Sequence, residues 1–373
     1  MIRLKRIGAG IIGLHNHYHA FPMADYMKQG IPGVELVAVA DERELELTRF
    51  AETYGVAGVY SDYHELLKRK DIDLVIVTSD TGAHCEHVLA AAAAGKHILL
   101  DKPISLSLKE ADEMITAAEK ADVKFMMAYL IRFNSVYLKV KQLIDTGVIG
   151  RVTSVYQSIR CPLSFITSSP YTSSPGWYVE PSRCGGGGFL DHGVHYTDYL
   201  RWLLGSEAVS VIGKVANLAY KDIPVDDYGI AIYEFNSGVI ATVESTWHAA
   251  DWYGPLSSPE QCVITGTEGE IVVHYQKSPQ LEVSSRKAPY RGRTYFDWEG
   301  DERYNICYKS IVEHMVECIR EDKVPSVTGK DGRLALEMIL AAYEASRTGQ
   351  IIRFPFEKRC CSAVEILNGD NGA

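Results

Sequence analysis

A lysine, an aspartate and a histidine in this sequence have the types and spacing that suit proton transfer. Asp191 and His195 are four residues apart in the run GGGGFLDHGVHYTDYLRWLLG, residues 185–205. On a helix both side chains would lie on one face, and the apolar residues of the same run would face the core. An imidazole titrates near neutral pH, and a carboxylate can orient it or a substrate. We therefore expect an acid–base pair here; the alternative is a surface helix with ordinary polar residues.

Lys102 follows a short apolar run, residues 97–100, within the segment GKHILLDKP. In an open parallel sheet, ligands bind beyond the carboxyl ends of the strands. A lysine at such an end can hydrogen-bond a substrate hydroxyl and stabilise the charge that develops on its oxygen. The alternative is a solvated lysine in a turn.

The first forty residues have the order strand, glycine turn, helix, strand, acid. Gly8, Gly10 and Gly13 form a G-x-G-x-x-G motif, and the apolar run of residues 34–40 ends at Asp41. This order is typical of a dinucleotide site, in which glycines let the pyrophosphate approach a helix N-terminus and the acid binds the adenosine ribose. A carboxylate at position 41 repels a 2′-phosphate, so we predict NAD rather than NADP; Arg43 would partly compensate.

Apolar runs alternate with helical segments up to residue 128, which predicts a doubly wound parallel sheet in residues 1–128. In residues 129–356 extended segments cluster instead, at 152–160, 209–215, 229–235, 239–247, 262–265 and 270–274. They predict an α/β domain with a mostly antiparallel sheet, covered by helices at 304–320 and 334–348. Residues 357–373 are predicted to form a short, loose tail.

The overall composition excludes several classes of function. The 373 residues carry a net charge of −10 and are 46% hydrophobic. We expect no nucleic-acid or membrane partner, because basic runs and long apolar stretches are both missing from the sequence. The N-terminus does not resemble a signal peptide, and the eight scattered cysteines contain no C-x-x-C. We therefore predict reduced thiols and a cytoplasmic location.

Two irregular, aromatic-rich stretches interrupt the second domain, at residues 161–183 and 247–259. Long aromatic loops in a compact domain are usually functional, and aromatic faces stack on the C–H faces of sugars. We predict Trp177, Tyr178 and Trp252 as substrate contacts; burial or a subunit contact is the alternative.

Three histidines alternate directly after the glycine motif: His15, His17 and His19. Residues two apart on a helix point away from each other, so these imidazoles cannot converge on a metal without a loop. We predict no metal site here.

With these motifs in place, the sequence resembles the glucose–fructose oxidoreductase / inositol dehydrogenase / MocA family over residues 7–355. The resemblance rests on the glycine turn and on the segments TSDTGAH, AGKHILLDKP, AYLIRFN, GVIGRV, GGGGFLDHGVH and SVTGKDGRLALEMILAAYEASRTGQ. It implies a Rossmann domain followed by an α/β domain whose open sheet forms a homo-oligomer, as a dimer, tetramer or hexamer. The family's E-K-P lysine falls on Lys102, and its D-x-G-x-H pair falls on Asp191 and His195.

Combined with the glycine motif, the resemblance implies cofactor contacts at Gly8, Gly10, Ile11, Ile12, Gly13, Asp41, Thr78, Ser79, Asp80, His84, Asp101, Lys102 and Arg132. It implies substrate contacts at Lys102, Tyr129, Arg132, Asp191 and His195. Three features depart from the family pattern. Asp101 replaces a glutamate expected near the nicotinamide ribose, Ser79-Asp80 replaces Pro-Asn, and the histidine-rich stretch 14–19 is slightly longer than usual after the glycines.

We therefore predict an NAD-dependent oxidoreductase that acts on a ring secondary hydroxyl of a sugar, glycoside or inositol. In this prediction His195 is the general base, Lys102 polarises the hydroxyl, and Asp191 orients both substrate and imidazole. The cofactor either exchanges or stays bound, with an oxo-sugar as acceptor. Two alternatives remain open: an NAD-dependent glycoside-cleaving enzyme and a non-catalytic NAD-binding sensor.

Overall fold

Short, continuously buried strands build the N-terminal sheet. The computed structural model describes residues 6–163, 176–248, 260–274, 277–298 and 306–369. Six parallel strands lie in the order β3-β2-β1-β4-β5-β6, which is the doubly wound order of a dinucleotide-binding fold. They are β1 (Ile7–Ile12), β2 (Val34–Ala40), β3 (Gly58–Tyr60), β4 (Leu74–Val77), β5 (His97–Leu100) and β6 (Phe125–Met127). The predicted Rossmann sheet is confirmed.

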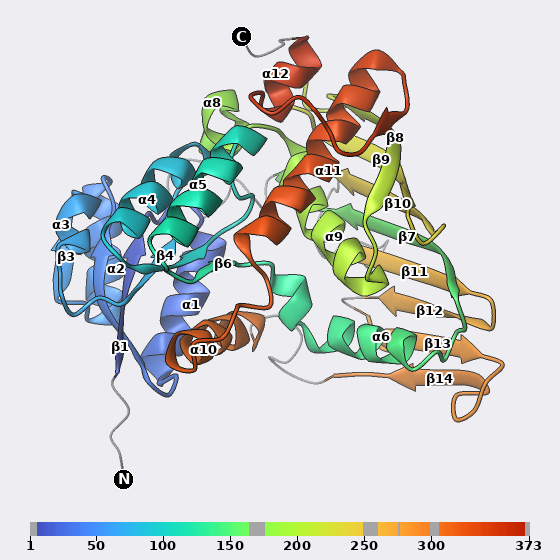
Figure 1. Ribbon diagram of the computed structural model, residues 1–373, viewed down its shortest axis with the longest axis horizontal. Coiled ribbons are helices and arrows are strands. Elements are labelled where there is room, and N and C mark those ends of the chain that lie inside the picture. The colour runs from blue at the N-terminus through green and yellow to red at the C-terminus, as the bar shows by residue number, and fades with distance from the viewer. Residues whose placement is uncertain (1–5, 164–175, 249–259, 275–276, 299–305, 370–373) are drawn as a thin grey trace.

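Helices connect these strands and cover the sheet (Figure 1). They are α1 (His17–Gln29), α2 (Glu44–Tyr54), α3 (Tyr63–Leu67), α4 (Thr81–Ala93) and α5 (Leu108–Lys120). The best amphipathic pattern belongs to α5, which starts with a capping box between Ser107 and Glu110. These helices leave the carboxyl ends of the strands open to the second half of the chain.

The second sheet has nine strands in the order β14-β13-β12-β11-β7-β10-β9-β8-β15. All neighbouring strands pair antiparallel except β7 and β10, which pair parallel. The mostly antiparallel sheet is therefore confirmed. Its strands are β7 (Val152–Arg160), β8 (Ala208–Ala216), β9 (Tyr228–Phe235), β10 (Ile240–Thr246), β11 (Glu260–Gly266), β12 (Gly269–His274), β13 (Leu281–Ser285), β14 (Gly292–Phe296) and β15 (Ile352–Arg353).

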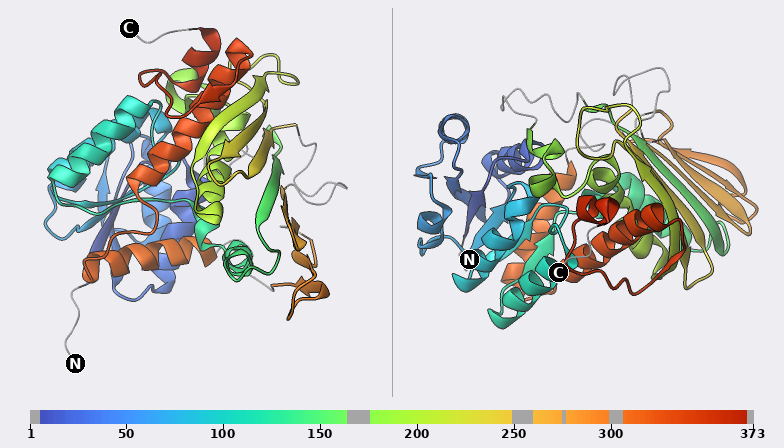
Figure 2. Two further views of the ribbon diagram at one scale, coloured as in Figure 1. Left: turned by 45° about the vertical axis from the view of Figure 1, so that its right-hand side comes forward. Right: turned by 90° about the horizontal axis from the view of Figure 1, so that it is seen from above.

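Two long helices fill the space between the sheets, α9 (Gly188–Leu204) and α11 (Gly329–Thr348), as Figure 2 shows. Both pack on one face of the nine-stranded sheet, and α11 also contacts α5 of the first domain. The shorter elements of this half are η1 (Leu130–Phe133), α6 (Ser135–Asp145), η2 (Gly176–Val179) and α8 (Pro181–Cys184). This arrangement brings α9 against the carboxyl ends of the Rossmann strands.

Two C-terminal segments differ from their predicted roles. The helix α10 (Ile306–Arg320) packs on α1 rather than on the second sheet, because its buried Ile311 and Met315 extend the apolar cluster beneath α1. The predicted loose tail contains α12 (Ala363–Asn368), which starts with a Ser362–Glu365 capping box and packs on α11. Ala363 and Ile366 are fully buried there, so apolar burial orders this segment.

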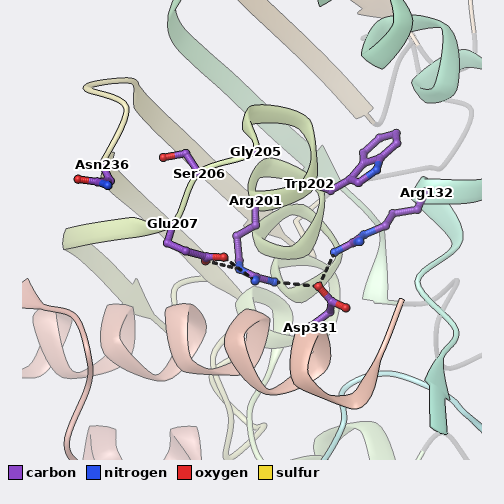
Figure 3. Close-up of a pocket in the computed structure, with 8 residues that line it drawn as sticks. All are labelled: Arg132, Arg201, Trp202, Gly205, Ser206, Glu207, Asn236 and Asp331. Carbon is purple, nitrogen blue, oxygen red and sulfur yellow. Dashed lines mark hydrogen bonds and ion pairs between the residues drawn. The ribbon is translucent and has the colours of Figure 1, made fainter. Parts of the chain in front are cut away.

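Ion pairs join η1 to α9 and α11 within the second half of the chain. Arg132 donates from Nε to Asp198 Oδ2 over 2.7 Å and from Nη2 to Asp331 Oδ1 over 3.1 Å. Arg201 donates from Nε to Glu207 Oε2 over 2.6 Å and faces Asp331 (Figure 3). The network borders a pocket of about 430 Å³ lined by Arg132, Arg201, Trp202, Gly205, Ser206, Glu207, Asn236 and Asp331.

Arg132 was predicted to contact both cofactor and substrate, and the structure instead places its guanidinium in this junction. The physical reason is the buried Asp198, which needs a cationic partner. Burial raises the pKa of Asp198 to about 6 even with Arg132 beside it. No helix among the described residues is long and apolar enough to cross a membrane. All eight cysteines lie in described segments, and none of them forms a disulfide there.

Candidate active site

Lys102 and Asp191 form a buried ion pair where the two halves of the chain meet. Lys102 lies just beyond β5, and Asp191 lies in the first turn of α9. The Lys102 ammonium donates to Asp191 Oδ1 over 2.7 Å and to the Asp191 carbonyl oxygen over 2.9 Å. The predicted catalytic lysine and aspartate are therefore brought together, with the lysine fixed from two sides.

The Asp191 carboxylate stays ionised in this environment. Burial acts to raise its pKa, but the charges of His192 and Lys102 outweigh burial and hold the pKa at about 2. His192 Nδ1 lies 3.1 Å from Asp191 Oδ2. A charged carboxylate beside the ammonium keeps Lys102 in place and leaves its third N–H for a substrate oxygen.

His195 lies one helical turn after Asp191 and is neutral at physiological pH. Burial, followed by the charges of Lys102, His19 and His192, lowers its pKa well below the usual value. Its ring meets the ring of Tyr129 edge-on, with centroids 5.9 Å apart. Within the described structure His195 Nδ1 and the Tyr129 hydroxyl have no hydrogen-bond partner. A neutral imidazole with an open nitrogen is a competent proton acceptor.

Asp226 holds the N-terminus of α9. Its carboxylate accepts from the backbone N–H groups of Gly187 at 2.8 Å and Phe189 at 2.9 Å, and from the Tyr343 hydroxyl at 2.6 Å. Gly187 is needed here, because a Cβ at this position would lie 1.8 Å from the Asp226 carbonyl oxygen. The glycine run therefore lets α9 begin in close contact with Asp226, in the segment that leads into β9. This contact fixes the position of Asp191.

The turn after β1 differs from the predicted glycine motif. Gly8 and Gly10 lie inside β1, where a Cβ would meet the Asp71 carbonyl oxygen at 1.7 Å or the Leu66 side chain at 3.0 Å. Ile11 and Ile12 are buried in the cores on the two faces of the sheet. All four residues were predicted as cofactor contacts; they have packing roles because the strand runs on to residue 12.

Gly13 is the glycine that forms the turn itself. It has φ of 79°, and a Cβ there would lie 2.5 Å from Ser79 Cα. The Thr78 hydroxyl donates to the Gly13 carbonyl oxygen over 2.6 Å. Of the predicted motif, only Gly13 therefore serves the close turn from β1 to α1.

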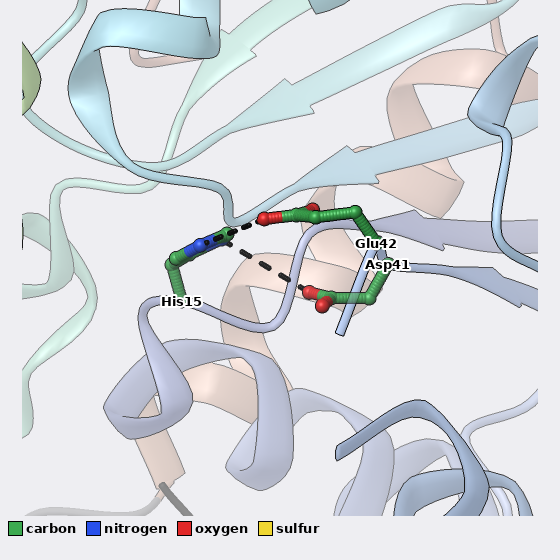
Figure 4. A group of neighbouring side chains, drawn as sticks. All are labelled: His15, Asp41 and Glu42. Atoms are coloured by element: carbon green, nitrogen blue, oxygen red, sulfur yellow. Dashed lines mark ion pairs between the residues drawn. The ribbon is translucent and has the colours of Figure 1, made fainter. Parts of the chain in front are cut away.

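Asp41 ends β2 beside this turn, as predicted. Its Oδ2 accepts from the Leu14 N–H over 2.6 Å, and Arg43 donates to both of its oxygens. His15 Nε2 lies 3.1 Å from Glu42 Oε1, and His15 Nδ1 lies 4.0 Å from Asp41 Oδ2 (Figure 4). The hydrogen bond from His15 is the main cause that lowers the pKa of Glu42 to about 2.

His15, Asp41 and Glu42 are close enough to bind one cation. The Asp41 oxygens, however, already accept from a backbone N–H and a guanidinium. A metal ion would have to displace Arg43, so we assign no metal to this group. Asp80 Oδ2 also lies 3.9 Å from His15 Nε2. In the described structure, His17 and His19 do not belong to this group of side chains.

The same region fits a dinucleotide. No side chain caps the N-terminus of α1, and its first turn contains no acidic residue. Uncapped helical N–H groups and a positive helix end suit a pyrophosphate, and Asp41 suits a ribose. The buried His15 Nδ1, which lacks a hydrogen-bond partner in the described structure, adds one more polar atom for a ligand.

The residues predicted after β4 brace the neighbouring loops. His84 is buried, with Nδ1 2.8 Å from the Pro103 carbonyl oxygen and Nε2 3.2 Å from the Ser79 carbonyl oxygen. The Ser79 hydroxyl lies 3.0 Å from His87 Nδ1. Asp80 caps α4 and accepts from Arg183 of α8 over 2.7 Å. The Lys102 loop is thus tied to the loop after β4.

Trp177 and Tyr178 are buried against the turn rather than presented to a ligand. Their rings stack with centroids 3.9 Å apart. Trp177 Nε1 donates to the His15 carbonyl oxygen over 3.3 Å, and the Tyr178 hydroxyl donates to Asn16 Oδ1 over 3.4 Å. They were predicted as sugar platforms; the structure uses them to hold η2 on the turn. Trp252 lies outside the described residues.

Several important residues had no usable signal in the sequence. Asp226, Arg183 and Asn16 each act on a segment far away in the chain. In the sequence, His19 is distinguished only as one of three alternating histidines. Asp101 was expected near the nicotinamide ribose, but its carboxylate is occupied by Asn16, His19 and the Lys102 N–H.

Two family models cover most of the chain. The oxidoreductase family with an NAD-binding Rossmann fold matches residues 6–129, and the GFO/IDH/MocA C-terminal domain matches residues 137–272. The chain belongs to the GFO/IDH/MocA family. It is an NAD-binding member, and the resemblance inferred from the motifs is confirmed.

Relatives in this family support the enzyme class. The chain is 28% identical over 369 residues to myo-inositol 2-dehydrogenase of Thermotoga maritima, covering 98% of this chain and all of that protein. It is 28% identical over 362 residues to scyllo-inositol 2-dehydrogenase (NAD(+)) of Bacillus subtilis, covering 96% and 97%. The structure of levoglucosan dehydrogenase with NADH and levoglucosan has a TM-score of 0.82 at 23% identity, covering 94% of this chain and all of that one. The family places this protein among the NAD(P)-dependent oxidoreductases, and the likeness to levoglucosan dehydrogenase shows the shared fold.

Proposed function

We propose that this enzyme oxidises a secondary hydroxyl on the ring of a sugar, glycoside or inositol, with NAD as the hydride acceptor. The observation that carries the proposal is the buried Lys102–Asp191 ion pair one turn from His195, whose Nδ1 has no partner within the described structure. A cation and a neutral base side by side are what removal of a hydroxyl proton requires.

Each of the three residues has a separate task. Lys102 donates a hydrogen bond to the reacting hydroxyl oxygen and stabilises its developing negative charge. His195 accepts the hydroxyl proton, and its low pKa keeps it neutral for that purpose. Asp191 stays ionised and holds the ammonium. NAD, when bound, supplies the hydride acceptor.

We also propose that the substrate is a ring with adjacent hydroxyls. The Tyr129 hydroxyl, buried beside His195, offers a further polar group, as does the third N–H of Lys102. The relatives named above act on inositols, and the levoglucosan dehydrogenase structure contains an anhydrosugar. Polar groups spaced along one wall suit neighbouring hydroxyls of a cyclic polyol.

The test is a substrate panel of inositols, free hexoses, glycosides and acyclic hydroxy acids, assayed by NADH formation. Each is also assayed without added NAD but with an oxo-sugar acceptor, which detects a bound, recycling cofactor. We expect turnover on at least one ring compound. Turnover confined to acyclic hydroxy acids would refute the proposal.

We further propose that the enzyme assembles through the outer face of the nine-stranded sheet. Backbone register aligns Ile212, Ile232, Thr242 and Tyr156 across β8, β9, β10 and β7. The row continues through Val263 and Val272, then through the charged Glu282 on β13, to Tyr295 on β14. Ile212, Ile232, Tyr156 and Tyr295 are exposed, and a mostly apolar row on one exposed face is typical of an interface.

A further inference from the structure

The Asp101 carboxylate, next to Lys102 in the chain, holds a second histidine at the candidate active site. Asp101 Oδ1 accepts from the Lys102 backbone N–H over 2.7 Å and from His19 Nδ1. Its Oδ2 accepts from the Asn16 side-chain amide. Asp101 and His19 are both buried, so this hydrogen bond is shielded from water.

This contact fixes the proton on His19. An ionised carboxylate can only accept, so Nδ1 of His19 must donate, and the neutral ring then has its lone pair on Nε2. Burial acts to raise the pKa of Asp101, but the charges of His19 and Lys102 keep it below the ordinary value. A carboxylate that accepts from one imidazole nitrogen fixes the tautomer and the orientation of the ring, as in the Ser-His-Asp triad.

His19 lies next to His195, although the two belong to different halves of the chain. Their ring centroids are 6.5 Å apart, with planes inclined at 68°. Two imidazoles in a direct hydrogen bond would have centroids about 5 Å apart, so proton transfer between these two rings requires a bridging group such as one water molecule. The other titratable groups facing His19 are Asp101, His17 on its own helix and Tyr308 of α10.

We propose that Asp101 and His19 form a proton relay that acts through His195. In the first step the substrate O–H bond breaks and an N–H bond forms on His195. In the second step that proton passes through the bridging water to His19 Nε2, and His195 returns to its neutral form. The Asp101 carboxylate offsets the positive charge on His19, and no electrons are exchanged. This relay rests on the proposed function, because it needs a hydroxyl proton to carry.

The relay explains how a histidine with a very low proton affinity can serve repeated turnovers. His195 is surrounded by Lys102, His192 and His19, so it cannot hold a proton for long. His19 has a carboxylate partner, whereas within the described structure His195 has none. His19 is accordingly a positioning and relay residue, while contact with the substrate remains with His195 and Lys102.

The test compares His19→Asn, His19→Ala and the control His314→Asn. An asparagine amide takes the place of Nδ1–H and can still donate to Asp101, so His19→Asn keeps the structural contact but removes the relay nitrogen. His314 lies on α10 outside the candidate site. We measure kcat, KM, NAD binding by fluorescence titration, melting temperature, and rescue by added imidazole, on the ring substrate that the wild type uses best.

We expect His19→Asn to lower kcat about 10²-fold, the usual scale for a lost proton-transfer group, with unchanged NAD affinity and melting temperature. Imidazole should restore part of the turnover of His19→Ala, and His314→Asn should match the wild type. Wild-type kcat in His19→Asn, or a loss that imidazole does not restore in His19→Ala, would overturn the relay while leaving the proposed function intact. A wild type inactive on every ring compound would remove both.

Discussion

The charged side chains at the candidate site occur in pairs, and each pair determines what its members can do. Lys102 is held by Asp191, and His19 is held by Asp101. Burial, followed by the charges of Lys102, His19 and His192, lowers the pKa of His195. At the scale of single residues, the site therefore places a hydrogen-bond donor held by a carboxylate beside a neutral proton acceptor.

Replacing Lys102 should affect both activity and stability. Lys102→Met keeps the length of the side chain but leaves the buried Asp191 carboxylate unpaired, which costs about 3–5 kcal/mol of unfolding free energy. We expect kcat to fall at least about 10²-fold. The double variant Lys102→Met/Asp191→Asn should regain much of the stability but none of the activity.

Urea denaturation and steady-state kinetics measure the two effects, with the exposed Lys120→Ala as control. Near-normal turnover of Lys102→Met would exclude Lys102 from the reaction.

The pH profile should reflect the low pKa of His195. Its folded-state pKa lies below the unfolded value of about 6.5, so the neutral form dominates from pH 6.5 upward. We expect the acid limb of kcat/KM for alcohol oxidation to lie below pH 6.5, with no His195 titration between pH 7 and 8. Because folding lowers this pKa, the unfolded chain binds a proton at His195 more readily than the folded protein does. The contribution of His195 to the free energy of unfolding is therefore fully present above pH 6.5 and decreases as the pH falls.

The measurement is kcat/KM between pH 5 and 9 for the wild type and His195→Asn. The variant should lose about 10²-fold in rate and should lack the acid limb. If the limb persists unchanged in the variant, the base is another group.

At the scale of elements, the strand and helix types were predictable, whereas their junctions were not. The apolar runs of β2 and β5 and the amphipathic α5 identify themselves through local pattern. Gly8 and Gly10 matched a fingerprint, yet they pack inside β1, because a sequence motif does not reveal where the strand ends. Asp226 was missed because it caps α9 from 37–39 residues away.

The start of α9 should tolerate no side chain at position 187. Gly187→Ala would place a Cβ 1.8 Å from the Asp226 carbonyl oxygen, so the helix must shift and carry Asp191 with it. We expect both the melting temperature and kcat to fall. Gly205→Ala, at the other end of the same helix, has open space around its Cβ and should cost only about 1 kcal/mol for its positive φ. Equal activity losses in both variants would contradict this account.

The turn between β2 and α2 should determine the choice of cofactor. The Asp41 carboxylate repels a 2′-phosphate, and it also ties up the Arg43 guanidinium. We expect NAD to bind about tenfold or more tightly than NADP, since one close charge repulsion costs about 1–2 kcal/mol. Asp41→Ala frees Arg43 to pair with a 2′-phosphate, so it should reduce the difference between the NAD and NADP affinities. Asp41→Ala/Arg43→Ala should reduce this difference less. Fluorescence titration measures all affinities, and equal or tighter NADP binding by the wild type would disprove the preference.

At the scale of the whole molecule, the fold class and the proximity of Lys102, Asp191 and His195 could be predicted from the sequence, but the packing of distant segments could not. Periodicity indicates two sheets, and the Lys102, Asp191 and His195 motifs indicate where they meet. Nothing local shows that α10 packs on α1, that α12 packs on α11, or that Arg132 belongs to the junction network. These contacts form between segments far apart in the sequence and depend on burial in the complete fold, which local patterns do not encode.

Helices cover one face of the nine-stranded sheet. Among the described residues, no helix covers its outer face (Figure 2). Ile232 is an exposed member of the mostly apolar row on this face, paired with Ile212 and Thr242 on the neighbouring strands. If this face joins subunits, Ile232→Lys buries a charge in the interface and should shift the mass measured by light scattering to that of a monomer. The fold should persist, because the side chain points away from α9 and α11. Val324→Lys, at an exposed site remote from the sheet, is the control and should assemble like the wild type. A wild type that is monomeric at tens of micromolar, or an Ile232→Lys variant that assembles normally, would show that this face does not join subunits.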